Sequence, residues 1–193
     1  MIKADILNIL RSKSTVLTFK EILIASGEKR PDLLRRRLNY YVQQGELYSI
    51  RRGLYAKNKN YDRLELATKI LIPAYVSFET VLAEAGVIFQ YYKTIFVATY
   101  KTREIECDGQ PYSFRQIKDD ILMNPAGVEN KGNYLAATKE RAFLDVLYLN
   151  KGYYCDNLSA LDFEKVNKLL PIYNNKRMVQ KVKQYFEKFQ EEL

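Results

Sequence analysis

A group of cationic and amide side chains early in the chain has residue types that contact nucleic acid. Arg35, Asn39 and Gln43 are spaced four residues apart, so they share one face of a helix, and Arg36 and Tyr40 lie beside that stripe. An α-helix fits the major groove of B-DNA, where Arg can grip guanine and Asn or Gln can grip adenine with paired hydrogen bonds. The pattern predicts a surface that reads base edges, with Tyr40 on the backbone or on a thymine methyl group.

A second basic feature follows this helix. Arg51 and Arg52 precede Gly53 between two short β-prone runs at 46–50 and 54–56, a pattern typical of a hairpin. Arginines at a hairpin tip can reach phosphates or enter a narrow minor groove. Other cations would position the module on the phosphates without reading sequence, namely Lys13, Lys20, Lys29 and Arg30. The predicted DNA-binding residues are Arg30, Arg35, Arg36, Asn39, Tyr40, Gln43, Arg51 and Arg52.

The charge of the chain is distributed unevenly. Its 193 residues carry a net charge of +8, and residues 1–60 hold 13 Lys or Arg against 5 Asp or Glu, so they account for all of it. Residues 61–193 hold 18 of each sign. This division is typical of a small nucleic-acid-binding module joined to a neutral domain. Two alternatives stay open at this point: a solvated charged helix face, with Arg37 in a structural role, and a module that docks another protein.

The elements that must position these side chains are predicted from local signals. Apolar spacing predicts a helix over residues 2–12. Thr18 and Glu21 form a capping box for a second helix that ends at Gly27, with Leu17 and Ile22 as a hydrophobic staple. Pro31 suits the first turn of a third helix that continues to residue 45, and Asp32 complements its dipole. The order of helix, helix, turn, helix and basic hairpin predicts a winged helix-turn-helix over residues 1–58.

The remainder, residues 61–193, is expected to form a separate α+β domain after a hinge at residues 58–60. Helical spacing appears at 62–72, 78–83, 138–149, 159–169 and 175–190. Residues 94–101 read as a strand covered on both faces, and Asp108-Gly109 predicts a hairpin turn. The fold class expected for the whole chain is therefore α+β, with an N-terminal winged helix-turn-helix followed by helices around a small antiparallel sheet.

Several kinds of chemistry are excluded or weakened by composition. The chain has no histidine, which excludes imidazole metal sites and histidine bases, and its two cysteines are too few for a disulfide framework. No apolar run approaches the roughly 20 residues that cross a bilayer, so a cytoplasmic protein is expected, without cofactor or metal. Glu104, Glu106 and Asp108 alternate along a strand, which leaves a magnesium-dependent nuclease as an alternative. Glu140, Arg141 and Asp145 are expected to form a structural ion-pair cluster on one helix.

Three segments together resemble the AbiEi family of antitoxins and transcriptional regulators. Residues 51–55 (RRGLY) follow a three-helix module like the wing of that family, and residues 73–82 (PAYVSFETVL), closed by Gly86, look like its central segment. Residues 137–145 (ATKERAFLD) are similar to its later helix. The resemblance covers roughly residues 1–150 in consistent order, and the chain is shorter than many members of the family.

The resemblance implies a non-enzymatic protein with two activities in a type IV toxin–antitoxin, or abortive infection, system. A winged helix would repress its own operon by binding duplex DNA, at an operator expected to be an inverted repeat. The second domain would confer immunity against an AbiEii-type nucleotidyltransferase toxin without forming a stable complex with it. The motif residues Ser77, Phe78, Glu79 and Asp145 bring no established chemistry with them. A regulator that has no toxin partner is the remaining alternative.

Overall fold

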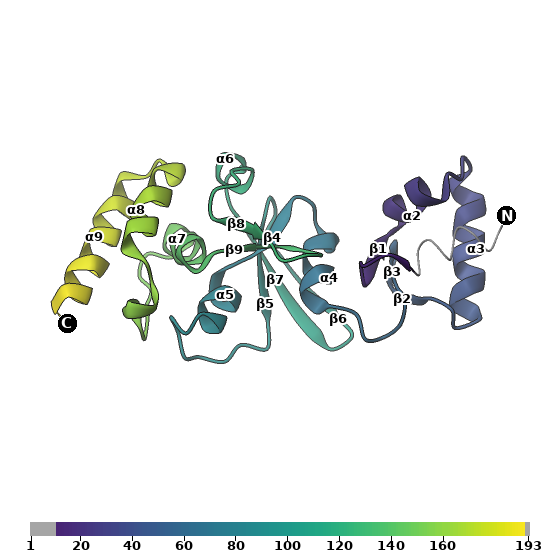
Figure 1. Cartoon of the computed structure of the whole chain (residues 1–193), viewed down its shortest axis with the longest axis horizontal. Helices are drawn as coiled ribbons and strands as arrows, with labels where there is room; N and C mark the ends of the chain where they lie inside the picture. Colours follow the sequence, from purple (N-terminus) through teal and green to yellow (C-terminus); the bar gives the residue numbers. More distant parts are fainter. Residues whose placement is uncertain (1–10, 192–193) are drawn as a thin grey trace. The chain divides into compact units, whose positions relative to one another are not determined.

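The computed structural model describes residues 11–191 and divides the chain into two compact units, one ending at Ile70 and one beginning at Leu71 (Figure 1). Both units combine helices with a β-sheet, so the chain is α+β as expected. Most of the helix predicted over residues 2–12 lies outside the described residues. Each unit is described by itself below.

The N-terminal unit places three helices beside a three-stranded antiparallel sheet in the order β1-β3-β2. The second and third predicted helices and the hairpin are confirmed, whereas the short strand β1 was not predicted and contains Leu17, which was expected to act as a staple. The elements are β1 (Val16–Thr18), α2 (Phe19–Ser26), α3 (Pro31–Gln43), β2 (Tyr48–Arg51), β3 (Leu54–Ala56) and α4 (Arg63–Ile70).

Local chemistry explains where these helices begin and end. Glu21 N–H donates to Thr18 Oγ1 at 3.1 Å, and Thr18 N–H donates to the Glu21 carboxylate at 2.7 Å, which completes the predicted capping box. Gly27 ends α2 with φ +64°, a left-handed conformation that favours glycine. Pro31 occupies the first turn of α3. The core beneath these helices is a single apolar cluster of Leu17, Ile22, Leu34, Leu38, Leu47 and Tyr55.

Helix α4 belongs to the N-terminal unit, which corrects the expected boundary at residues 58–61. Glu65 is fully buried, and its carboxylate accepts hydrogen bonds from Thr15 N–H at 2.8 Å and Thr15 Oγ1 at 2.6 Å. Lys69 Nζ donates to the Val16 carbonyl at 2.6 Å and pairs with Glu21 and Glu65 at 3.1 and 3.0 Å. These contacts attach α4 to the start of the sheet and to α2, so the division falls after Ile70.

The C-terminal unit contains a six-stranded sheet in the order β6-β7-β5-β4-β9-β8. Its pairing is mixed, because β4 runs parallel to β9 and β5 runs parallel to β7; the expected small antiparallel sheet is therefore wrong. The hairpin at Asp108-Gly109 is confirmed, and both residues have the positive φ that such a two-residue turn needs, +49° and +69°. The strands are β4 (Ala74–Val76), β5 (Ile95–Thr99), β6 (Arg103–Cys107), β7 (Gln110–Gln116), β8 (Val128–Asn130) and β9 (Leu135–Ala137).

Helices pack on and beside this sheet, and Figure 1 shows α7, α8 and α9 next to one another. Helix α7 is the central one, since seven consecutive residues of it, 141–147, are buried. None of the helices within residues 11–191 combines the length and apolarity needed to cross a bilayer. The helical elements are α5 (Phe78–Glu84), α6 (Asp119–Leu122), α7 (Lys139–Leu149), η1 (Leu158–Ala160), α8 (Phe163–Leu169), η2 (Leu170–Tyr173) and α9 (Lys176–Glu191).

The attachment of α4 can be tested with Lys69→Met. This substitution removes the cation between two carboxylates and leaves the buried Glu65 carboxylate without its ion-pair partner. We expect the free energy of unfolding of the N-terminal unit to fall by about 3 kcal/mol. Lys20→Met, on the exposed side of α2, is the matched control and should change it little. Hydrogen exchange of the α2 and α3 amides in the full chain measures both, and equal protection in the two variants would contradict the attachment.

Candidate nucleic-acid interface

Helix α3 presents four of the eight predicted residues on its solvent side. Leu34 and Leu38 point into the apolar core of the unit. The opposite side of the helix is exposed and carries Arg36, Asn39, Tyr40 and Gln43. Tyr40 is 56% exposed, and its ring meets Tyr41 edge to face with centroids 5.7 Å apart. Arg36 makes no ion pair or hydrogen bond with any described residue, so its guanidinium is available to a ligand.

Arg35 lies on the flank of this side and is held by two neighbours. Its Nη1 donates to Asp32 Oδ1 at 2.8 Å, and its guanidinium carbon lies 4.8 Å from the centroid of the Phe19 ring. The Arg35 side chain remains 58% exposed. Its charge also reaches Tyr55, because burial raises the pKa of that phenol while Arg35 opposes the rise.

The turn of the β2–β3 hairpin is attached to the same place. Phe19 N–H donates to the Gly53 carbonyl at 2.8 Å, and Gly53 adopts φ +80° in the turn. Phe19 therefore contacts the turn through its backbone and Arg35 through its ring. Arg52 precedes Gly53 in the turn and is exposed. The structure thus brings the flank of α3 and the hairpin turn to one neighbourhood around Phe19.

The two other arginines of these segments differ from their neighbours. Arg51 closes β2 next to an irregularity in the strand pairing, is half-buried, and has an Nη1 atom that is buried without a hydrogen-bond partner among residues 11–191. It is thus less available to solvent than Arg52. Arg37 pairs with Glu28 at 3.1 Å and is only 30% exposed, in agreement with the structural role considered for it.

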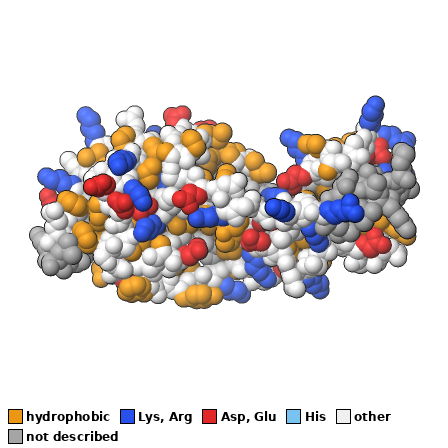
Figure 2. All heavy atoms as spheres, in the orientation of Figure 1, with side chains coloured by type: hydrophobic (Ala, Val, Ile, Leu, Met, Phe, Trp, Pro, Cys, Tyr) orange, Lys and Arg blue, Asp and Glu red, His pale blue; other side chains and the backbone are white. Residues whose placement is uncertain are grey.

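Charge around this surface is mostly positive. Arg30 caps α3 with its backbone and is exposed, as are Lys13, Lys20 and Lys29. Figure 2 shows Lys and Arg side chains on the visible face of the N-terminal unit. The sequence analysis assigned Asp32 only to the helix dipole, yet its side chain is 88% exposed and contacts a predicted DNA-binding residue. The i, i+3 spacing of Asp32 and Arg35 was the signal that could have revealed this contact.

In the C-terminal unit, the most concentrated polar cluster is built around Asp145. Its carboxylate is fully buried and accepts hydrogen bonds from three hydroxyl groups: Ser77 at 2.7 Å, Tyr75 at 3.0 Å and Tyr173 at 2.6 Å. Arg141 Nε lies 3.5 Å from the same carboxylate. The segments 73–82 and 137–145, singled out by the family resemblance, therefore meet through this cluster.

Arg141 extends the cluster to the backbone of two other segments. Its Nη2 donates to the Ile121 carbonyl at 2.6 Å, and its Nη1 donates to the Ala126 carbonyl at 2.8 Å. The predicted pair of Arg141 and Asp145 is present, but Glu140 lies apart and accepts from Asp162 N–H at 3.4 Å. The cluster is closed off from solvent and rich in internal partners, so it holds elements together rather than offering a reactive group.

Burial controls the ionisation of this cluster. Loss of solvent raises the pKa of Asp145, although the Arg141 charge and the three hydroxyl donors oppose the rise. Burial and the neighbouring Asp145 carboxylate both raise the pKa of Tyr75 and Tyr173 well above the ordinary phenol value. Both tyrosines therefore keep their protons at neutral pH and act as hydrogen-bond donors.

The acidic residues of β6 do not assemble a metal site. The Glu104 carboxylate accepts a hydrogen bond from Ser113 Oγ at 2.7 Å, and Glu104 and Glu106 lie on the exposed side of the strand. Across residues 11–191, no three acidic or cysteine side chains come together as a metal-binding group. The arrangement gives no support to the magnesium-dependent nuclease alternative.

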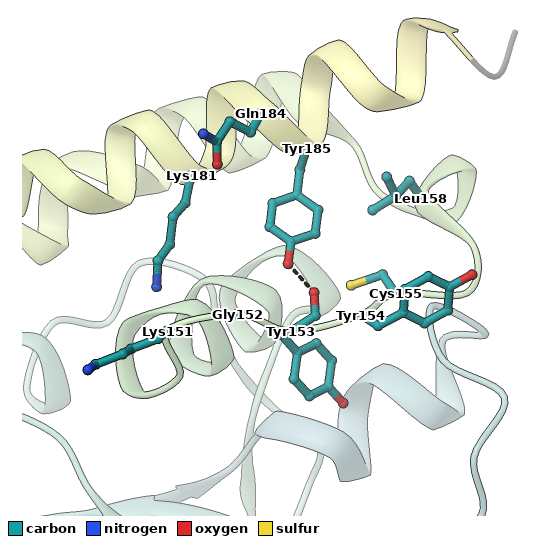
Figure 3. Close-up of a pocket in the computed structure, with 9 residues that line it drawn as sticks. All are labelled: Lys151, Gly152, Tyr153, Tyr154, Cys155, Leu158, Lys181, Gln184 and Tyr185. Carbon is teal, nitrogen blue, oxygen red and sulfur yellow. Dashed lines mark hydrogen bonds between the residues drawn. The ribbon is translucent and has the colours of Figure 1, made fainter.

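A cavity of about 270 Å³ lies between α9 and the segment that follows α7 (Figure 3). Lys181 and Tyr185 project into this space from α9. Lys181 Nζ donates to the carbonyls of Leu147 and Asn150 at 3.2 and 2.5 Å, and Tyr185 donates to the Tyr153 carbonyl. The polar groups of the cavity are therefore engaged in attaching α9 to the end of α7.

Comparison with known proteins does not assign the chain: no protein-family model matches it, and no curated protein matches it.

The supporting role of the Asp145 cluster is tested by Tyr173→Phe. The change removes one of the three hydroxyl donors, and the buried carboxylate then loses hydrogen-bond energy that no water replaces. We expect a loss of about 2 kcal/mol and a decrease in Tm of about 4–8 °C. Tyr100→Phe, at an exposed tyrosine, is the control and should leave Tm unchanged. Thermal unfolding of the full chain measures both, and an unchanged Tm for Tyr173→Phe would contradict the role.

Proposed function

We propose that this chain is a DNA-binding transcriptional autorepressor whose N-terminal unit is a winged helix-turn-helix. In this proposal α3 is the recognition helix, which enters the major groove, and the β2–β3 hairpin is the wing, which contacts phosphates or the minor groove. Arg36, Asn39 and Gln43 read base edges together with Arg35, and Tyr40 contacts the backbone or a thymine methyl group. Arg30, Arg51 and Arg52 bind the backbone beside them.

One observation carries this proposal: the flank of α3 and the hairpin turn meet at Phe19. The Gly53 carbonyl accepts from Phe19 N–H at 2.8 Å, and the Phe19 ring lies against Arg35. Cations from two elements are therefore gathered on one side of the unit that carries the entire net charge of the chain. A surface that combines phosphate-binding cations with groove-reading side chains is what duplex DNA requires.

The C-terminal unit supplies the second half of the proposal, an antitoxin activity against an AbiEii-type nucleotidyltransferase toxin. This half rests on the family resemblance of residues 1–150. The contact of the two C-terminal motif segments through Ser77 and Asp145 supports it, because segments far apart in sequence form one structural unit. The chain has no enzymatic role in this proposal, and it counteracts the toxin without forming a stable complex.

DNA binding is tested with the full chain on a duplex that carries the sequence upstream of its own gene. Arg35→Ala should cost about 1–3 kcal/mol on this duplex and relax the base preference. Arg52→Ala should weaken all duplexes similarly and reduce the slope of log K against log salt by about one unit. Fluorescence anisotropy over a series of salt concentrations measures both effects.

Lys151→Ala is the control for this experiment, because it removes an exposed cation from the C-terminal unit. It should bind like the unaltered chain. If Arg35→Ala and Arg52→Ala also bind like the unaltered chain, this surface is not the DNA interface.

The antitoxin half is tested by co-expression with an AbiEii-type toxin encoded next to the gene. The full chain should restore growth to cells that express the toxin. Arg52→Ala should restore growth equally well when its expression comes from an unrelated promoter, because immunity is assigned to the other unit. The two proteins should elute separately in size-exclusion chromatography. Growth arrest that persists with the full chain would leave a regulator without a toxin partner.

A further inference from the structure

An acidic side chain on the outward side of α3 needs an explanation in a DNA-binding surface. Asp32 is the one acidic residue of α3, it is 88% exposed, and it lies one turn before Arg35 and Arg36. A carboxylate on this side repels phosphates and lowers the affinity for any duplex. Its presence therefore points to a purpose other than overall affinity.

The contacts of Asp32 indicate what that purpose is. Asp32 Oδ1 accepts from Arg35 Nη1 at 2.8 Å, while the Phe19 ring supports the same guanidinium from 4.8 Å. An ion pair this exposed adds little to stability, so its effect lies in orientation. Two contacts of different chemistry, a charged acceptor and an aromatic face, restrict the rotamers of a side chain that is otherwise long and mobile.

The pairing also determines which edge of Arg35 remains available. Nη1 is engaged with Asp32, and neither Nη2 nor Nε donates to an acceptor within the described residues. These two nitrogens form a planar fork, and such a fork matches the O6 and N7 acceptors of guanine. The Asp32 charge offsets that of Arg35, so the pair attracts a phosphate less strongly than Arg36 does.

We propose that Arg35 reads a guanine base and that Asp32 is a positioning residue that determines this specificity. The inference rests on the proposed DNA-binding function and deepens it. Asp32 fixes the Arg35 fork toward the base edge and penalises contacts with phosphate alone. The pair thus contributes to selectivity, whereas the unpaired Arg36 contributes to affinity.

The experiment selects bound duplexes from a randomised library with the full chain and measures salt-dependent anisotropy on a non-specific duplex. The unaltered chain should enrich guanine at one position of its site. Asp32→Asn should reduce that guanine preference about tenfold and should bind the non-specific duplex more tightly. Arg35→Lys should lose the same preference, because an ammonium lacks the fork.

Arg36→Ala is the matched control on the same helix. It should weaken binding to all duplexes and flatten the salt slope while keeping the Arg35-dependent guanine preference. All of these substitutions are at exposed positions, and an unchanged Tm confirms that each variant is folded.

The outcomes separate this inference from the proposed function. If Arg36→Ala weakens binding but Asp32→Asn keeps the base preferences of the unaltered chain, the inference about Asp32 is overturned and DNA binding stands. If Asp32→Asn merely loses affinity for every duplex, Asp32 does not act through Arg35, which also overturns the inference. If the unaltered chain binds no duplex, both the inference and the proposed function fail.

Discussion

The surface of the N-terminal unit depends on Phe19, the first residue of α2. Its N–H group binds the hairpin turn at Gly53, and its ring supports Arg35 on α3. The position of Phe19 is determined by the capping box just before it, in which Glu21 takes part. Burial tends to raise the pKa of Glu21, but the Thr18 N–H group and Lys69 together lower it, so the carboxylate stays charged and keeps the box closed. A buried lysine on α4 thereby supports the geometry of an exposed surface.

Two physical scales explain what the sequence could predict of the fold. Helices α2 and α3 and the Asp108-Gly109 hairpin were predictable, because caps, glycines and apolar spacing act over a few residues. The parallel pairings of the C-terminal sheet were not, because they join strands separated by other strands or helices. Glu65 and Lys69 misled the boundary in a different way. An i, i+4 pair of opposite charges is typical of a solvated helix side, yet here both charges reach the backbone and side chains of β1 and α2.

The candidate sites divide along the same line. Periodicity correctly placed Asn39 and Gln43 on the exposed side of α3, because the helix itself determines that side. Composition could not distinguish Arg51 from Arg52, although strand pairing leaves one half-buried and the other exposed. The contact between Ser77 and Asp145 joins residues 68 positions apart, and such a contact emerges only from tertiary packing.

The attachment of α4 sets the length of any portable fragment of this protein. A fragment cut in the polar stretch at 58–60 would keep every predicted DNA-binding residue but lose Glu65 and Lys69. The Thr15 N–H group and the Val16 carbonyl would then lack their partners, and the edge strand β1 would be left uncovered. Transplanting this unit onto another protein, or expressing it alone, therefore requires the chain through Ile70.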